Sequence, residues 1–574
     1  MPDVIHLANG TTINHEDALD SESNVVASHA QFQSLLQLYM RLWEHKPAVS
    51  TLVAAHMGVS LEHIEMAHPS AWKRGSFNLV VPMLVNQSLQ KDPGQNSDQN
   101  SQNPEQVLLR VPVPAKVGEE HHPGSVADKL RCEAASYIWM QQHCPEVRIP
   151  HLYGFSIPGA NGGQFVHASR LSIFRRAVLY MRQLVASWLR RPVPSDYLPV
   201  ALPAMPESLP LPLADNGYMI LEYFSEAQFG KQTPFTVPRD RPLHELYTEE
   251  PVKTRNLCRG VARTMLALAR VPQPRIGAFR FSLADGTIRL DGRPATCSIP
   301  MLEAESAPRT IALDTTYSSA GQYVSDLARF HESVFRTGPH MVEARDDAEY
   351  QMATMVAMRA TAHHFVELGG GTTANGEPFI LQLSDSNAGN MLVDDDWNVT
   401  AIFDLEWLFA APVAQLLTPL WLTWQAVNDI TSDGYDDYCA SRSVFMDVFR
   451  EEERKQTGTE KTPLSDAMDA SWTSQRTWFY FALTSVNGMT HIFRNRLKPL
   501  FFSTTPETQK TTAETTVAEA MPLATATTET TTTSRLPREA LYRLWQPDAQ
   551  AVVAQKLRDR KQHEAAVKRL FEDK

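Results

Sequence analysis

Cysteine is scarce in this sequence, and the few cysteines are not spaced as metal ligands or disulfide partners. Five cysteines are spread over 574 residues, and no C-x-x-C pair occurs. Disulfide frameworks and structural zinc sites use more cysteines at closer, regular spacing. We therefore expect reduced thiols and a cytoplasmic protein.

Long apolar runs and an apolar leader are missing as well. No stretch reaches the roughly 18 apolar residues of a transmembrane helix, and the first twenty residues are polar and acidic. Acidic residues outnumber Lys and Arg by 65 to 53, which gives a net charge of −12. This balance argues against general nucleic-acid binding. The G-x-S-x-G and H-E-x-x-H motifs of serine hydrolases and zinc proteases do not occur.

The composition that is present suits a large folded protein. Hydrophobic residues make up 43 % of the chain, and the length suggests about three or four domain-sized units. Two low-complexity stretches, 86–106 and 503–535, are predicted to be a disordered loop and a flexible insertion. A helix is predicted over 537–572, where apolar residues recur on one face.

Short apolar runs between polar turns predict an α+β fold. Predicted strands occupy 77–85, 107–113, 217–224 and 379–383, with a hairpin of 391–393 and 399–403. Apolar residues at four-residue steps predict a helix over 126–143. We expect residues 1–224 to hold one antiparallel sheet and a single helix. Residues 225–574 are expected to be mainly helical and to carry a functional loop at 383–407.

The functional loop combines three oxygen-bearing side chains. Asp385 follows a strand, Asn390 lies five residues later, and the hairpin brings Asp404 back beside them. Phosphoryl transfer needs a carboxylate to orient the attacking hydroxyl and oxygen ligands to hold Mg²⁺. The alternative is a polar loop in which Asn and Asp serve as caps.

An upstream pair strengthens the phosphoryl-transfer interpretation. Arg110 interrupts an apolar strand, and a buried cation there needs an anionic partner. Glu133, on the following helix, is the candidate, and a strand–helix ion pair of this kind positions nucleotide phosphates in protein kinases. A solvated strand face for Arg110 is the alternative.

Taken together, these motifs resemble the aminoglycoside phosphotransferase and choline kinase group, which has the two-lobed protein-kinase-like fold. The resemblance is closest to a large fungal branch of that group. It is carried by the segments WKRGSFN, LLRVPVP, GYMILEYF, PRIGAFRF, SDSNAGN and IFDLEW, which span most of the chain.

The resemblance implies a small β-rich N-lobe, a large helical C-lobe, and binding of ATP and Mg²⁺. It implies that Asp385 is the catalytic residue and that Asn390 and Asp404 are the Mg²⁺ ligands. The remaining implied nucleotide-site residues are Gly75, Ser76, Phe77 and Asn78 in a covering turn, Arg110 with Glu133, and Glu222, Tyr223 and Phe224 in the hinge. The implied activity is transfer of phosphate to a hydroxyl group of a small molecule.

Two departures from the family pattern leave an alternative open. Leu383 stands where the family usually has His, and Arg110 stands where it has Lys. Arg and Lys are not interchangeable, because Arg is larger and forked. The alternative is a catalytically degraded pseudokinase that binds nucleotide or a partner as a scaffold.

One further segment, 169–194, is basic and amphipathic. It contains six arginines and no acidic residue. Such a helix can lie on an anionic membrane or bind a partner. We favour instead an insertion that packs its apolar face onto the N-lobe and solvates its arginines.

Overall fold

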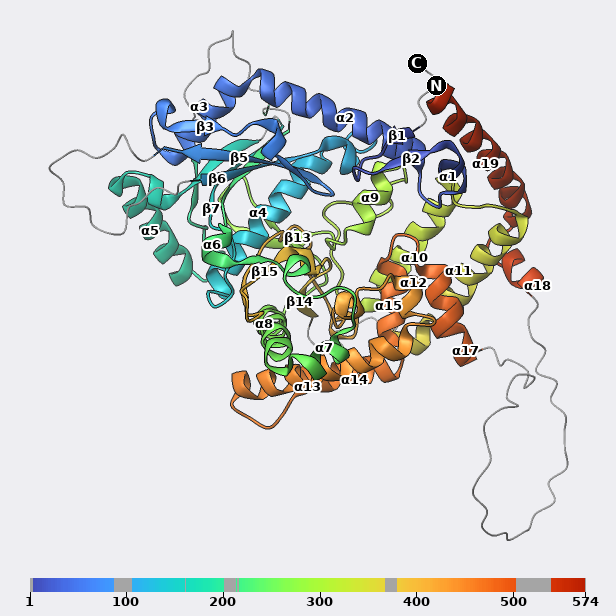
Figure 1. Cartoon of the computed structure of the whole chain (residues 1–574). Coiled ribbons are helices and arrows are strands. Elements are labelled where there is room, and N and C mark those ends of the chain that lie inside the picture. The colour runs from blue at the N-terminus through green and yellow to red at the C-terminus, as the bar shows by residue number, and fades with distance from the viewer. Residues whose placement is uncertain are drawn as a thin grey trace.

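An eight-stranded antiparallel sheet organises the first part of the chain (Figure 1). The structure is a computed structural model that describes residues 4–86, 106–159, 162–200, 213, 216–366, 379–501 and 538–572. The strand order is β3-β5-β6-β10-β7-β8-β9, with β4 paired to β5. The strands are β3 (Ile64–Met66), β4 (Lys73–Arg74), β5 (Asn78–Val85), β6 (Gln106–Pro112), β7 (Leu152–Ile157), β8 (Gly163–His167), β9 (Tyr197–Val200) and β10 (Tyr218–Glu222). The three strands predicted from the first 224 residues are confirmed as β5, β6 and β10.

Helices cover both faces of this sheet. Alternate residues of β10 show the division: Met219 and Leu221 join a core cluster with α4 (Ser125–His143), and Tyr218 and Ile220 join another. The second cluster is completed by α2 (Val25–Glu44) and α3 (Lys46–Met57), which lie above the sheet in Figure 1. The prediction of a single helix beside the sheet was therefore wrong. Because β5 and β6 bury apolar residues on both faces, a second helical layer is required.

The rest of the chain is mainly helical, as predicted. The short helices are α6 (Glu226–Phe229), α7 (Leu243–Glu249), α9 (Ser298–Ala304), α12 (Val427–Ile430), α16 (Met489–Ile492) and α17 (Lys498–Phe501). One further short helix, α1 (His15–Asp20), lies near the start of the chain. The longer ones are α8 (Pro251–Ala269), α10 (Ala320–Thr337), α11 (Arg345–Phe365), α13 (Tyr435–Thr457), α14 (Pro463–Thr473) and α15 (Arg476–Thr484).

Small sheets are set among these helices. They pair β1 (Val4–His6) with β2 (Thr12–Asn14), β12 (Ala278–Phe281) with β13 (Ile288–Gly292), β14 (Phe379–Leu383) with β17 (Leu408–Pro412), and β11 (Lys231–Gln232) with β15 (Met391–Val393) and β16 (Val399–Ile402). The predicted 391–403 hairpin is thus confirmed. Its turn is closed by the carboxylate of Asp394, which accepts hydrogen bonds from the backbone of Asp396 and Asn398.

The two ends of the described chain lie side by side (Figure 1). Val567 and Phe571 of the last helix pack with Ile5, Leu7 and Val25. The single helix predicted over 537–572 is divided into α18 (Arg538–Arg543) and α19 (Ala549–Glu572). Pro547 explains the break, because proline lacks an N–H and disfavours helical backbone at the residue before it. The stretch 503–535, and all of 86–106 except its two end residues, lie outside the described residues.

The basic segment forms α5 (Ile173–Trp188) at the outer edge of the sheet (Figure 1). The expectation that its apolar face packs onto the N-lobe was wrong, whereas the arginines of the helix are exposed as expected. Leu179 is the helix's one buried residue, whereas Ile173, Phe174 and Trp188 are 83 %, 75 % and 82 % exposed. Within the described residues, no helix has the length and apolarity needed to cross a membrane.

The packing of the sheet core makes a direct prediction about stability. Phe155 is fully buried, with its ring centroid 5.1 Å from that of Phe165 and 5.0 Å from that of Phe281. Phe155→Ala should lower the free energy of unfolding by about 3–5 kcal/mol, the usual cost of such a core truncation. Phe235→Ala is the matched control, because Phe235 is 75 % exposed, and it should change stability by about 0.5 kcal/mol at most. Urea unfolding measures both variants, and equal effects would contradict this packing.

Candidate functional site

A buried ion cluster joins the sheet to the helical part of the chain, and Arg110 is at its centre. On β6, Val107, Leu109 and Val111 pack towards α2 and α3, so Arg110 lies on the opposite face, beside α4. Its Nε lies 2.8 Å from Glu133 Oε1 on that helix. The predicted strand–helix ion pair is therefore present in the structure, and the solvated alternative is excluded, since the Arg110 side chain is only 10 % exposed.

The segment after β16 supplies two more carboxylates to the same cluster. Asp404 Oδ1 lies 2.5 Å from an Arg110 terminal nitrogen, and Glu406 Oε2 lies 3.3 Å from that nitrogen. Lys129 stands one turn before Glu133 on α4, and its Nζ lies 2.8 Å from Glu133 and 2.5 Å from Glu406. The cluster therefore contains two cations and three carboxylates.

One negative charge in the cluster has no positive counterpart. Oxygen atoms of Glu133, Asp404 and Glu406 come within 4.8 Å of one another. The side chains of Glu133 and Glu406 are 0 % and 3 % exposed, whereas that of Asp404 is 25 % exposed. Asp404 is therefore the carboxylate that solvent or a cation can reach. Three carboxylates are also a donor set that suits Mg²⁺, a hard cation that prefers oxygen.

The excess negative charge of the cluster affects the pKa values of Asp404 and Glu406. Burial raises the pKa of Asp404, and the neighbouring Glu406 and Glu133 raise it further against the opposing effect of Arg110. Burial alone would also raise the pKa of Glu406, but Lys129 and Arg110 outweigh it and lower that pKa. Of these two carboxylates, Asp404 is thus the one that takes up a proton first, or that gains more from a bound cation.

Backbone contacts fix the position of Asp404. Asp404 has a φ of 66°, in the left-handed region that non-glycine residues rarely occupy. The residue before it, Phe403, donates its backbone N–H to the Asn390 carbonyl at 3.0 Å. This bond ties the end of the hairpin to the loop that carries Asn390, so a strained conformation is held where a charged side chain is presented.

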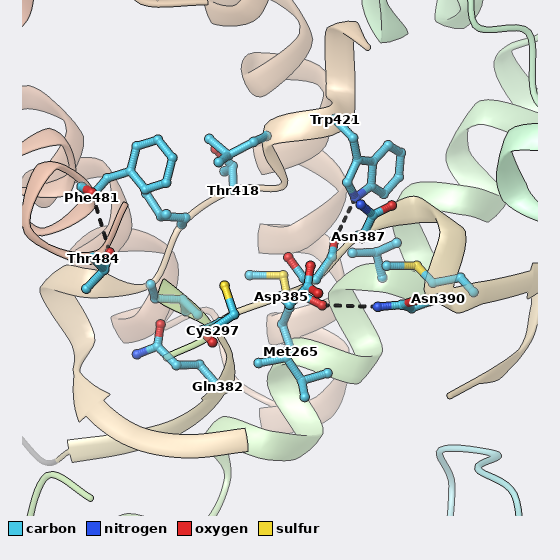
Figure 2. A pocket seen from close by; sticks show the side chains of 18 of the residues that line it. Met265, Cys297, Gln382, Asp385, Asn387, Asn390, Thr418, Trp421, Phe481 and Thr484 are labelled. Carbon is cyan, nitrogen blue, oxygen red and sulfur yellow. Dashed lines mark hydrogen bonds between the residues drawn. The ribbon is translucent and has the colours of Figure 1, made fainter. Parts of the chain in front are cut away.

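Asp385 and Asn390 lie on that loop, which follows β14. The Asn390 side-chain nitrogen donates to the Asp385 carbonyl at 3.5 Å, as Figure 2 shows. This contact leaves the Asn390 Oδ1 as the atom that can face a cation. The Trp421 indole N–H donates to the Ser386 carbonyl at 2.9 Å and so holds the loop from the other side. Burial, and then the nearby Glu406, raise the pKa of Asp385.

A cavity of about 610 Å³ opens beside Asp385. Figure 2 shows Asp385 near its centre, with Trp421 and Thr418 on one side and Gln382 and Cys297 on another. The wall mixes apolar side chains such as Met265 and Phe481 with amide and hydroxyl groups. This size and mixture suit a small organic molecule with polar substituents.

The turn at Gly75, Ser76, Phe77 and Asn78 lies against the ion cluster. The Asn78 side chain donates to Glu406 at 2.9 Å and accepts from Lys129 at 3.0 Å. Phe77 is buried with its ring 4.8 Å from that of Trp407. Gly75 and Ser76 precede this anchored pair, and the Gly75 carbonyl accepts from Lys116 at 3.1 Å.

The predicted hinge residues lie at the end of β10. Glu222 pairs with Arg148 and also accepts the His151 backbone N–H at 3.0 Å. Arg148 in turn stacks 4.9 Å from the Phe224 ring centre, while Tyr223 is 37 % exposed. The Glu222 carboxylate is therefore already engaged in a structural contact.

Sequence reasoning missed two members of the ion cluster, Glu406 and Lys129. The spacing of Lys129 and Glu133, four residues apart on a helix, is a recognisable signal for an ion pair. Glu406 gave a weaker signal, as an acidic residue among the apolar residues of the segment LEWLF. The cavity-lining residues Cys297 and Trp421 gave none, since they approach the loop through tertiary packing.

Comparison with known proteins adds no relative: no model of a protein family and no curated protein sequence matches the chain. The family resemblance therefore rests on the motifs alone.

The ion cluster makes a prediction that separates buried from exposed ion pairs. Glu406→Gln should lower the free energy of unfolding by about 3–5 kcal/mol, the usual cost of removing one partner of a buried ion pair. The substitution removes the carboxylate that contacts both buried cations, Lys129 at 2.5 Å and Arg110 at 3.3 Å. Glu451→Gln is the matched control. Glu451 pairs with Arg255 and Lys455 at the surface, and its loss should cost about 1 kcal/mol at most. Denaturant unfolding of both variants measures the difference. An unchanged free energy of unfolding in Glu406→Gln would contradict the role of the cluster.

Proposed function

We propose that the protein is an ATP- and Mg²⁺-dependent phosphotransferase that acts on a hydroxyl group of a small molecule. The observation that carries the proposal is the position of Asp404, held 2.5 Å from the strand cation Arg110, which also pairs with Glu133 on α4. Strand cation, helix carboxylate and post-hairpin aspartate are the three charged parts with which protein kinases position nucleotide phosphates and metal. The proposal includes a two-lobed kinase-like arrangement, with the sheet to about residue 224 as the small lobe.

Different residues would bind the metal ion, the phosphates and the adenine of the nucleotide. Asp404 and the Asn390 Oδ1 would hold Mg²⁺, which neutralises negative charge on the nucleotide phosphates. Arg110 would bind a phosphate oxygen through its second terminal nitrogen, since Nε and the other terminal nitrogen already contact the three carboxylates. The Gly75–Asn78 turn would cover the nucleotide, and the Glu222–Phe224 hinge would contact its adenine.

Asp385 would orient the acceptor hydroxyl and take its proton. The burial that raises the pKa of Asp385 makes the carboxylate a better proton acceptor than an exposed aspartate. The cavity beside Asp385 would hold the acceptor, and its volume of 610 Å³ fits a small molecule rather than a folded protein.

A cytoplasmic location also stays a prediction.

A specific contact favours a second candidate, a nucleotide- or partner-binding scaffold without catalysis. Arg110 approaches the carboxylate that would bind metal, and an arginine held there can substitute for the cation. Leu383 occupies the position where a histidine would support the catalytic loop. In this case nucleotide binding would not require Mg²⁺.

The phosphotransferase proposal predicts the effect of replacing Asp385. Asp385→Asn should lower the rate of Mg²⁺-dependent ATP turnover by about 10²–10⁴-fold, the usual contribution of a positioned base. Turnover is measured as ADP release, first with water and then with a panel of amino sugars, amino alcohols and sugars as acceptors.

Asp395→Asn is the matched control, because Asp395 lies exposed in the 394–398 turn. It should turn over ATP at the wild-type rate. Wild-type turnover in Asp385→Asn would contradict the assignment of Asp385. If the wild type and the variants all bind ATP without Mg²⁺ and none of them turns it over, the scaffold is favoured.

A further inference from the structure

The apolar face of α5 points away from the protein. On a helical projection with 3.6 residues per turn, the apolar residues fall on one continuous side. They are Ile173, Phe174, Val178, Tyr180, Met181, Leu184, Val185 and Trp188, and each is at least 46 % exposed. A stripe this wide normally faces a protein core, so its exposure needs a separate explanation.

The opposite side of α5 attaches the helix to the protein. Leu179, which is buried, lies on this side with Gln183, four residues on. The Gln183 side chain donates to the Pro194 carbonyl at 3.1 Å and to the Asp196 carboxylate at 2.8 Å. Because these contacts fix the orientation, α5 is held with its apolar face outward.

Positive charge borders the apolar face. On the helical projection, Arg175 and Arg182 lie along one edge and Arg176 along the other, and Arg190 and Arg191 follow the end of the helix. All five are exposed. Residues 169–194 contain no acidic residue, although the whole chain has a net charge of −12. Basic charge is thus concentrated around one apolar surface.

We propose that α5 docks on the surface of a membrane that contains anionic lipids. Apolar side chains can enter the boundary between headgroups and acyl chains, and flanking arginines can bind lipid phosphates and carboxylates. Trp188 and Tyr180 are aromatic residues of the kind enriched at that boundary. A second copy of the chain is a poorer match, because two such faces would bring like charges together.

The experiment is vesicle flotation with the full-length chain. Two vesicle types are compared, one of phosphatidylcholine alone and one of phosphatidylcholine mixed with phosphatidylserine. The chain should float with the anionic vesicles and much less with the neutral ones. Binding should fall as salt is raised, because salt screens the attraction.

Two variants test the two parts of the surface separately. Arg176→Gln with Arg182→Gln should weaken partition into anionic vesicles by about 25-fold, at about fivefold for each charge removed. Phe174→Ser with Trp188→Ser should weaken it at every salt concentration. The matched controls are Arg558→Gln with Arg569→Gln, on the exposed side of α19, and Phe235→Ser. They should bind as the wild type does.

Each remaining outcome would overturn the proposal. If the wild-type chain does not float with anionic vesicles, the apolar face of α5 does not dock on lipid. Equal loss in the control and α5 variants assigns binding elsewhere. A wild-type dimer that becomes monomeric in Phe174→Ser with Trp188→Ser, without vesicle binding, identifies a second copy as the occupant. Because all the substituted residues are exposed, unchanged circular dichroism is expected for every variant.

Discussion

The contact between Arg110 and three carboxylates is the interaction on which the rest of the structure depends. It links strand β6 and the following helix α4 to the segment after β16, in which Asp404 lies 294 residues beyond Arg110. Removing charges from water is costly, and the cost is recovered only where geometry and additional hydrogen bonds are good. Lys129 and Asn78 supply these hydrogen bonds around Glu406. The sheet and the 391–403 hairpin are therefore held in one relative position by charge as well as by apolar packing.

The composition of this cluster also sets its chemistry. With three carboxylates and two cations, one negative charge is in excess, and it resides on the carboxylate nearest to solvent, Asp404. Glu406 acts on both sides of the site, because it raises the pKa of Asp404 and that of Asp385. Asp404 and the loop beside the cavity are thus electrostatically coupled through one buried residue.

Local patterns were enough to predict the elements that form the site. Alternating and continuous apolar runs located β5, β6, β10 and the 391–403 hairpin, and a buried cation correctly indicated a partner on α4. The bond between Asn78 and Glu406 was not predictable, since 328 residues separate the pair and no local rule connects them. The orientation of α5 was missed for a related reason. Amphipathicity shows that a helix has two faces, but tertiary contacts such as those of Gln183 decide which face points inward.

The central claim, that Asp404 provides the binding position for a divalent cation and its nucleotide, is tested most directly by thermal unfolding with ATP and Mg²⁺. The wild type should be stabilised only when both are present, by about 2.7 kcal/mol at a ligand concentration 100 times the dissociation constant. Asp404→Asn keeps the size of the side chain and removes its charge, so it should lose the Mg²⁺-dependent part of this shift. An identical shift in Asp404→Asn, or no shift in the wild type at millimolar nucleotide, would contradict the account.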